Sequence, residues 1–154
     1  MSVAFRRESD EEHKEPRLEL PIPPGPNLVT TAGLELTRAR VAEFEAQVAA
    51  AADDEARAAA RRILRYWSTR LTTAQLAPAP PPGKVAFGTR VTFRLNGAPR
   101  TIDIVGDDEA EPAAGKIAFS APLVRAMMGS SEGDFADFGG KADAIEIVRV
   151  QALP

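Results

Sequence analysis

The stretch 49-AAAADDEARAAA-60 places three acids inside a run of alanines and decides how the N-terminal half folds. Alanine is the strongest helix former, so local propensity alone favours one unbroken helix. Apolar or small residues recur in steps of three and four on both sides of the acids, which is typical of two amphipathic helices. The two series are Leu34, Val41, Phe44, Val48 and Ala51, and then Ala56, Ala60, Ile63, Trp67, Leu71 and Ala74.

Burial decides between one helix and two. A continuous rod would leave Phe44, Ile63 and Trp67 exposed unless two chains paired, so a structural dimer is one alternative. Two consecutive stripes of similar length instead suit an antiparallel helical hairpin within one chain. We therefore predict a monomer with a hairpin over residues 30–76. Thr30 or Thr31 is the expected N-cap, and Glu35 is the expected partner in a capping-box-like start.

The segments on either side of this hairpin lack a helical or strand period. Residues 1–29 carry mixed charge followed by LPIPPGPN, and this composition predicts a disordered or extended tail. Residues 77–83, APAPPPG, stop the second helix and form a stiff, proline-rich linker.

Residues 84–154 change to a period of two, which indicates β-strands. VTFRL and TIDIV flank Asn96-Gly97, a strong signal for a two-residue hairpin turn. KIAFS, DFADF and AIEIVRV supply further strands, and APLVRAMMG predicts one short helix whose apolar face packs in the core. The fold class is therefore α+β: a helical hairpin followed by a small, mostly antiparallel sheet with one short helix.

Composition removes several classes of chemistry. The chain has no cysteine and one histidine, which excludes Cys/His zinc sites. A serine-histidine-aspartate triad would have to use His13, which lies in a charged segment that looks disordered. No phosphate-binding glycine motif occurs either. Carboxylates acting with a divalent ion are therefore the catalytic groups that the composition still allows. No apolar run suits a membrane span or signal peptide, and we expect a cytoplasmic protein without a membrane partner.

Two charged clusters stand out. Four arginines follow the acidic stretch on the second predicted helix: Arg57, Arg61, Arg62 and Arg65. They form either a solvated face with local pairing or a surface for an anionic partner, and the scarcity of acids after Glu55 favours the partner. Asp107, Asp108 and Glu109 lie between Gly106 and Pro112, which is more typical of a solvated turn than of a metal site.

Three stretches occur in an order that resembles a known family. They are VTTAGLELTRARV at 29–41, GKVAFGTRVTF at 83–93 and VGDDEAEPAAGKIAFSAPLVRAMMGSSEGD at 105–134. Together they resemble the GreA/GreB family of bacterial transcription elongation factors. The resemblance implies that residues 84–154 form an FKBP-like domain. It also implies an accessory factor, not an enzyme, whose hairpin enters the secondary channel of RNA polymerase.

The resemblance also implies roles for residues at the hairpin tip. In the family, tip carboxylates share a Mg²⁺ ion with the polymerase, which itself cleaves backtracked RNA. Asp53, Asp54 and Glu55 would be these catalytic carboxylates, with no cofactor or metal of the protein's own. However, the family's tip glycine, serine and asparagine and its Asp-x-x-Glu spacing are missing, and arms of roughly 33 Å are short. The alternative is a short-finger regulator that binds without cleavage, resembling the nucleoside diphosphate kinase regulator group.

Two further contacts follow from the resemblance. Ser120 and Pro122 would touch the rim of the polymerase channel, although Ala121 replaces the serine of the family motif. The four arginines would face the RNA 3′ segment and other nucleic acid within the elongation complex. An FKBP-like prolyl isomerase is a poor alternative, because residues 84–154 contain no tyrosine or tryptophan for an aromatic-lined pocket.

Overall fold

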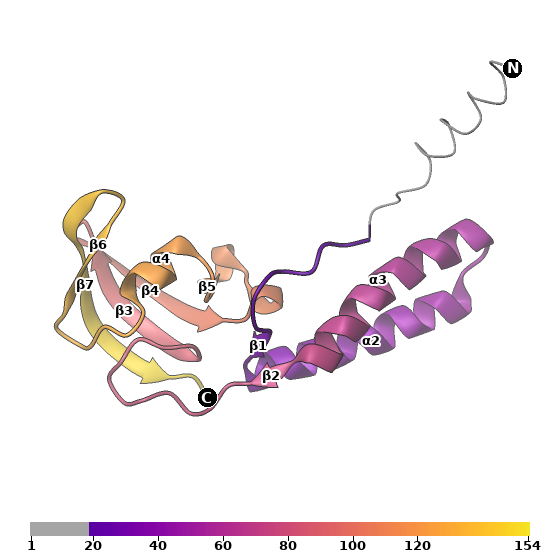
Figure 1. Ribbon diagram of the computed structural model, residues 1–154, viewed down its shortest axis with the longest axis horizontal. Helices are drawn as coiled ribbons and strands as arrows, with labels where there is room; N and C mark the ends of the chain where they lie inside the picture. Colours follow the sequence, from indigo (N-terminus) through magenta and orange to yellow (C-terminus); the bar gives the residue numbers. More distant parts are fainter. Residues whose placement is uncertain (1–18) are drawn as a thin grey trace, which may run out of the picture.

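The computed structural model describes residues 19–154 and shows a long helical hairpin attached to a β-sheet domain (Figure 1). The predictions for residues 1–18, His13 among them, lie outside the described residues. Residues 19–27 lead into a short strand, β1 (Leu28–Val29), which pairs in parallel with β2 (Gln75–Leu76). This small ladder lies at the base of the hairpin and joins the residues before it to those after it.

The hairpin consists of α2 (Thr31–Ala50) and α3 (Asp54–Thr73), which confirms the antiparallel arrangement. Thr30 is the N-cap of α2, and the Gly33 N–H donates to its Oγ1 at 3.0 Å. Asp53 is the N-cap of α3, and its Oδ1 accepts from the Ala56 N–H at 2.7 Å. The acid cluster thus ends one helix and starts the next because a carboxylate can satisfy the free N–H groups of a helix start.

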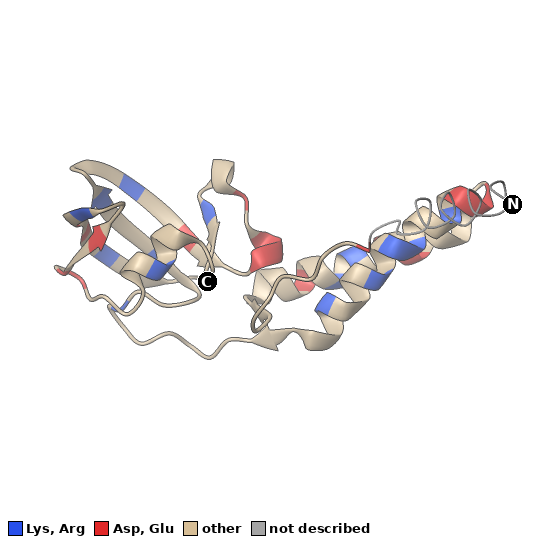
Figure 2. Cartoon of the chain, turned by 45° about the horizontal axis from the view of Figure 1, so that its top comes forward, with Lys and Arg blue, Asp and Glu red and all other residues tan. Residues whose placement is uncertain are grey.

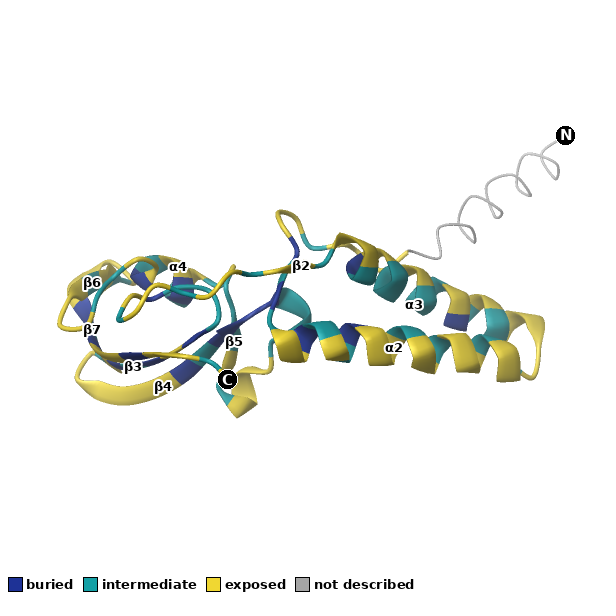
Figure 3. Ribbon diagram, turned by 90° about the horizontal axis from the view of Figure 1, so that it is seen from below, coloured by how far each residue is buried: buried dark blue, intermediate teal, exposed yellow. Residues whose placement is uncertain are grey.

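Burial along the hairpin is shallow because only two helices pack against each other. The outer faces are exposed, and the buried positions face the partner helix or the sheet domain (Figure 3). Most of the buried positions are small: Gly33, Thr37 and Ala60. Arg70, at the base of α3, is the exception, and it is buried by a contact with the sheet domain described below.

The sheet domain contains five strands in the order β5-β4-β3-β7-β6. Their bounds are β3 (Thr89–Leu95), β4 (Ala98–Val105), β5 (Lys116–Ala118), β6 (Phe135–Phe138) and β7 (Lys141–Ala152). All neighbouring pairs are antiparallel except β4 and β5, which run parallel. At the β3–β4 turn, Asn96 and Gly97 both have positive φ, as the predicted two-residue turn requires.

The segment between β4 and β5 contains two short 3-10 turns, η1 (Asp107–Glu109) and η2 (Pro112–Ala114). This segment turns β5 into the parallel direction, which the period-two pattern alone does not specify. The predicted short helix is α4 (Pro122–Met127).

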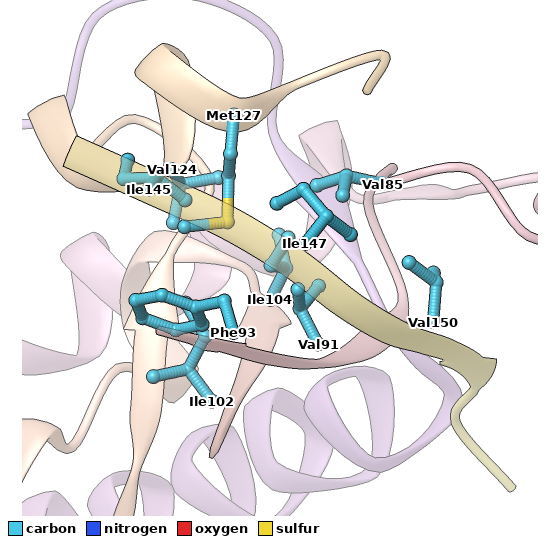
Figure 4. Close-up of a cluster of buried hydrophobic side chains, with 10 residues drawn as sticks. All are labelled: Val85, Val91, Phe93, Ile102, Ile104, Val124, Met127, Ile145, Ile147 and Val150. Atoms are coloured by element: carbon cyan, nitrogen blue, oxygen red, sulfur yellow. The ribbon is translucent and has the colours of Figure 1, made fainter. Parts of the chain in front are cut away.

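The core lies between one face of the sheet and α4 (Figure 4). Its buried members are Val85, Val91, Phe93, Ile102, Ile104, Val124, Met127, Ile145, Ile147 and Val150. Val124 and Met127 come from α4, as its apolar pattern predicts, whereas Met128 caps the helix end and is exposed. Among the described residues, none of the helices has the length and apolar character needed to cross a membrane.

Candidate functional site

The hairpin tip places Asp53, Asp54 and Glu55 together, far from the sheet domain (Figure 2). Asp53 is engaged in the N-cap of α3, and the Asp54 carboxylate pairs with Arg57 Nη1 at 2.9 Å. Arg57 Nη2 also donates to the carbonyl of Ala51 at 3.4 Å, so the arginine bridges both sides of the turn. Two of the three tip acids therefore stabilise the turn between α2 and α3.

This donor set does not make a metal site by itself. Within residues 19–154, no group of three histidine, cysteine, aspartate or glutamate side chains is arranged to hold a metal ion. A hard cation such as Mg²⁺ requires several oxygen ligands around one point. A metal at this tip would therefore need most of its ligands from another molecule.

The predicted arginine face lies along α3 (Figure 2). Arg61 and Arg65 are exposed and lie one turn apart, and Arg62 is half-buried beside them. Arg65 binds the carboxylate of Glu19 through two hydrogen bonds, Nη2 to Oε1 at 2.5 Å and Nε to Oε2 at 3.2 Å. Hydrogen bonding to Arg65 lowers the pKa of Glu19, helped by the charges of Arg65 and Arg62. The chain thus supplies an anion to this face from outside the helix.

Ser120 and Pro122 lie on the sheet domain, away from the hairpin tip. Ser120 Oγ donates to Asp107 Oδ1 at 2.6 Å, which ties the start of α4 to η1. Pro122 is the first residue of α4, and both side chains are exposed. The structure therefore places the predicted rim contact beside η1, on the sheet domain near the base of the hairpin, whereas the predicted tip acids lie at the far end of the hairpin.

The sequence analysis missed a joint between the hairpin and the sheet domain, built on Asp108. The Asp108 carboxylate accepts from Arg70 Nε at 2.5 Å and from the Tyr66 hydroxyl. The Arg70 side chain is only 3% exposed and that of Asp108 11%. Burial raises the pKa of Tyr66, and its hydrogen bond to the Asp108 carboxylate raises that pKa further. Because Tyr66 and Arg70 are four residues apart, one face of α3 presents both to the same carboxylate.

Glu109 forms the second half of the joint by capping α2 from the other domain. Its carboxylate accepts from the Thr30 hydroxyl, from the Thr30 N–H at 3.2 Å and from the Gly106 N–H at 3.1 Å. The expected capping partner, Glu35, pairs instead with Arg38 at 3.0 Å. Gly33 makes room for this arrangement, because a Cβ there would lie 2.3 Å from Glu109 Cδ.

These contacts change the interpretation of the acidic turn. Asp107 binds Ser120, Asp108 binds the base of α3, and Glu109 caps α2. The prediction of a solvated turn is therefore wrong. The contacts were missed because each partner of Asp108 and Glu109 on the hairpin is at least 38 residues away in sequence. The sequence did carry one signal for this contact. Tyr66 and Arg70 are four residues apart, so they lie on one helix face, next to a stripe that is otherwise apolar.

The sheet domain also carries the decisive similarity to known proteins. The family model described as "Transcription elongation factor, GreA/GreB, C-term" matches residues 80–152. Residues 80–152 therefore form a C-terminal domain of the GreA/GreB type. This match includes the joint acids Asp107–Glu109 and the predicted rim residues Ser120 and Pro122. It does not include the tip acids or the arginine face.

Individual relatives in the GreA/GreB family match over a similar extent. Transcription elongation factor GreA of Ralstonia nicotianae is 45% identical over 56 residues, which cover 35% of each chain. The protein of the same name from Pseudomonas aeruginosa is 40% identical over 76 residues, 46% of this chain and 48% of that one. The chain thus matches less than half the length of these relatives.

Two solved structures cover most of the chain at low identity. GreA factor homolog 1 of Thermus thermophilus is 19% identical, with a TM-score of 0.38, over 83% of this chain and 100% of that one. A GreA/GreB elongation factor from Nitrosomonas europaea is 17% identical, with a TM-score of 0.40, over 83% and 99%.

Proposed function

We propose that this protein is a cytoplasmic transcription elongation factor that binds RNA polymerase at its secondary channel. The sheet domain docks at the rim through the loop of Ser120 and Pro122, and the hairpin projects inward as a monomeric finger. The match of residues 80–152 to the GreA/GreB family model and the printed names of the relatives support this role. The protein is an accessory factor, and the polymerase carries out any chemistry.

The observation that carries the proposal is the joint at the base of the hairpin. Arg70, nearly fully buried, binds Asp108, and Glu109 caps α2 from the family domain. Asn27 adds a third tie, because its Nδ2 donates to the Arg70 carbonyl at 2.7 Å. A finger held at several points keeps one direction relative to the docking domain. A probe that must enter a channel needs such a fixed direction.

The charged residues of the finger follow a fixed order from its tip towards its base. Each helix has 20 residues, which corresponds to about 30 Å at 1.5 Å per residue. The acids lie at its end, and the arginines follow along α3 behind them. In the bound state the arginines face the RNA 3′ segment, because guanidinium groups bind phosphates through paired hydrogen bonds.

Two modes of action fit this finger. In the first, Asp53, Asp54 and Glu55 add oxygen ligands to a Mg²⁺ ion held by the polymerase, and cleavage of backtracked RNA is accelerated. In the second, the finger regulates by occupying the channel without cleavage. The local bonds of Asp53 and Asp54 favour occupancy, because these carboxylates already stabilise the tip turn.

Backtracked elongation complexes test both modes. The tip variant D53N/D54N/E55Q keeps the shape of the side chains, and asparagine is as good a helix N-cap as aspartate. The matched control E35Q/E43Q/E45Q removes the same charge from exposed positions of α2. Faster cleavage by the wild type and control, lost in the tip variant, establishes the first mode. Binding without faster cleavage establishes the second, and failure to bind RNA polymerase refutes the whole proposal.

A further inference from the structure

A short segment before α2, residues 27–30, contacts every part of the joint, and we call it the clasp. It contains β1, which pairs with β2 at the base of the hairpin (Figure 1). Its last residue, Thr30, binds the Glu109 carboxylate. The Leu28 carbonyl passes so close to Gly106 that a Cβ on this glycine would lie 2.4 Å from the carbonyl oxygen. The clasp thus lies between the two helices of the hairpin and the sheet domain.

Asn27 joins the clasp to the end of α3. It is 5% exposed, and its Nδ2 donates to the Arg70 carbonyl at 2.7 Å and to Thr73 Oγ1 at 3.2 Å. The last four carbonyls of an α-helix have no partner within the helix, and α3 ends at Thr73. Its backbone continues the link, because the Asn27 carbonyl accepts from the Gln75 N–H at 2.8 Å. Asn27 therefore closes the C-terminal end of α3 from outside the hairpin.

Arg70 is consequently held from two directions. Asp108 of the sheet domain binds its side chain, and Asn27 of the clasp binds its carbonyl. If α3 tilted about the Asp108 contact alone, the bond to Asn27 would break and leave a buried group without a partner, which costs more than losing an exposed bond. Glu109 caps the start of α2 in the same way, from the sheet domain. Side chains from outside the hairpin thus fix the base of both helices.

We propose that Asn27 is a positioning residue that sets the direction of the finger. It acts through Arg70 and needs no contact with RNA polymerase. Without the Asn27 amide bond the hairpin still forms, because α2 and α3 pack against each other along their length. Its direction relative to the sheet domain then varies. This inference deepens the proposed function: the direction is a property of the free protein, and only its consequence for elongation rests on that function.

The distance between two spin labels reports the direction of the finger in the free protein. The chain has no cysteine, so A52C at the tip and A113C in η2, both at exposed positions, each take one nitroxide. By pulsed electron paramagnetic resonance, the otherwise unchanged protein should give one narrow distance distribution. Asn27→Asp keeps the side-chain shape but loses the donating amide, and the distribution should become about two-fold broader. Gln75→Ala, which removes an exposed amide from β2, is the matched control and should leave the distribution narrow.

Gly106→Ala tests the clasp from the sheet domain. The φ of Gly106 is −71°, which alanine adopts readily, so the effect comes from the added Cβ against the Leu28 carbonyl and Glu109. Broadening in this variant and in Asn27→Asp, with helix content unchanged by circular dichroism, supports the proposal. A narrow distribution in Asn27→Asp, or a broad one without either substitution, overturns it. If Asn27→Asp loses helix content, Gly106→Ala decides, and a narrow distribution there overturns the proposal.

On RNA polymerase, a finger of variable direction should separate binding from effect. Asn27→Asp should bind at the same half-saturating concentration, because Ser120 and Pro122 lie outside the clasp, whereas the effect of saturating protein on backtracked complexes should fall. A smaller folded fraction alone would raise the half-saturating concentration and keep the full effect at saturation, and that result overturns the positioning role. Failure of the wild type to bind polymerase refutes the proposed function, and the label distances then decide this inference.

Discussion

The same tripeptide, Asp-Asp-Glu, occurs at residues 53–55 and at 107–109, and the two copies have different roles. At the hairpin tip the acids are exposed and bond only to their own turn. At the joint the acids connect α2, α3 and the start of α4, and the partners on the hairpin are far away in sequence. Composition therefore does not reveal whether an acidic cluster is solvated, catalytic or structural. The neighbours that the fold brings to it decide its role.

The largest expected difference between the two clusters concerns the Arg70–Asp108 pair. Arg70→Ala should lower the free energy of unfolding by about 3 kcal/mol, because it leaves the Asp108 carboxylate buried without its cation. Urea denaturation followed by the fluorescence of Trp67, the single tryptophan, measures this on the hairpin. The matched change at the tip, Arg57→Ala, should cost far less, because its partner Asp54 is fully exposed. Equal losses of unfolding free energy in the two variants would mean that the Arg70–Asp108 pair stabilises the protein no more than the Arg57–Asp54 pair does.

Gly33→Ala tests the close approach of Glu109 to α2. Alanine favours a helix over glycine by about 1 kcal/mol, so propensity alone predicts stabilisation. The added Cβ would lie 2.3 Å from Glu109 Cδ, and the shift of this carboxylate should cost about 1–3 kcal/mol. We expect net destabilisation in urea denaturation. In an E109A background the same substitution should become stabilising, and a stabilised G33A single variant would contradict the contact.

Asp53 provides the corresponding test at the tip. Asp53→Ala removes the N-cap of α3 and should cost about 1 kcal/mol. Asp53→Asn retains a capping oxygen and should cost only a few tenths of that amount. Thermal unfolding by circular dichroism compares the two variants with the wild type. If both substitutions destabilise equally, the charge of Asp53 matters more than its hydrogen bond to Ala56.

The smallest expected effect is the pH dependence of stability that Tyr66 causes near neutral pH. Its folded pKa is raised, so the joint favours the protonated phenol. The stabilisation is complete below the unfolded pKa of about 10 and is lost as pH rises above it. Absorbance at 295 nm follows this group directly, because Tyr66 is the single tyrosine. A titration midpoint at or below about 10 in the folded protein would show that Asp108 does not hold the hydroxyl proton.

The hairpin could be predicted from the sequence because its signals are local. Ile63 and Trp67 are four residues apart, so their shared face follows from helix geometry. The Asn96-Gly97 turn and the alternation of β3 are equally local. The joint could not be predicted in this way, because Asp108 acquires its meaning only when Tyr66 and Arg70 are brought beside it.

The sequence by itself determined the division into a helical hairpin and a sheet domain, since hydrophobic periodicity reports which faces must be buried. It also placed the tip acids and the arginine face on the hairpin. Only the tertiary structure decided that Glu109 caps α2, that β5 runs parallel to β4, and that Glu19 binds Arg65. The physical reason is range: periodicity records the spacing of neighbours along the chain, whereas these contacts join residues that become neighbours only after folding.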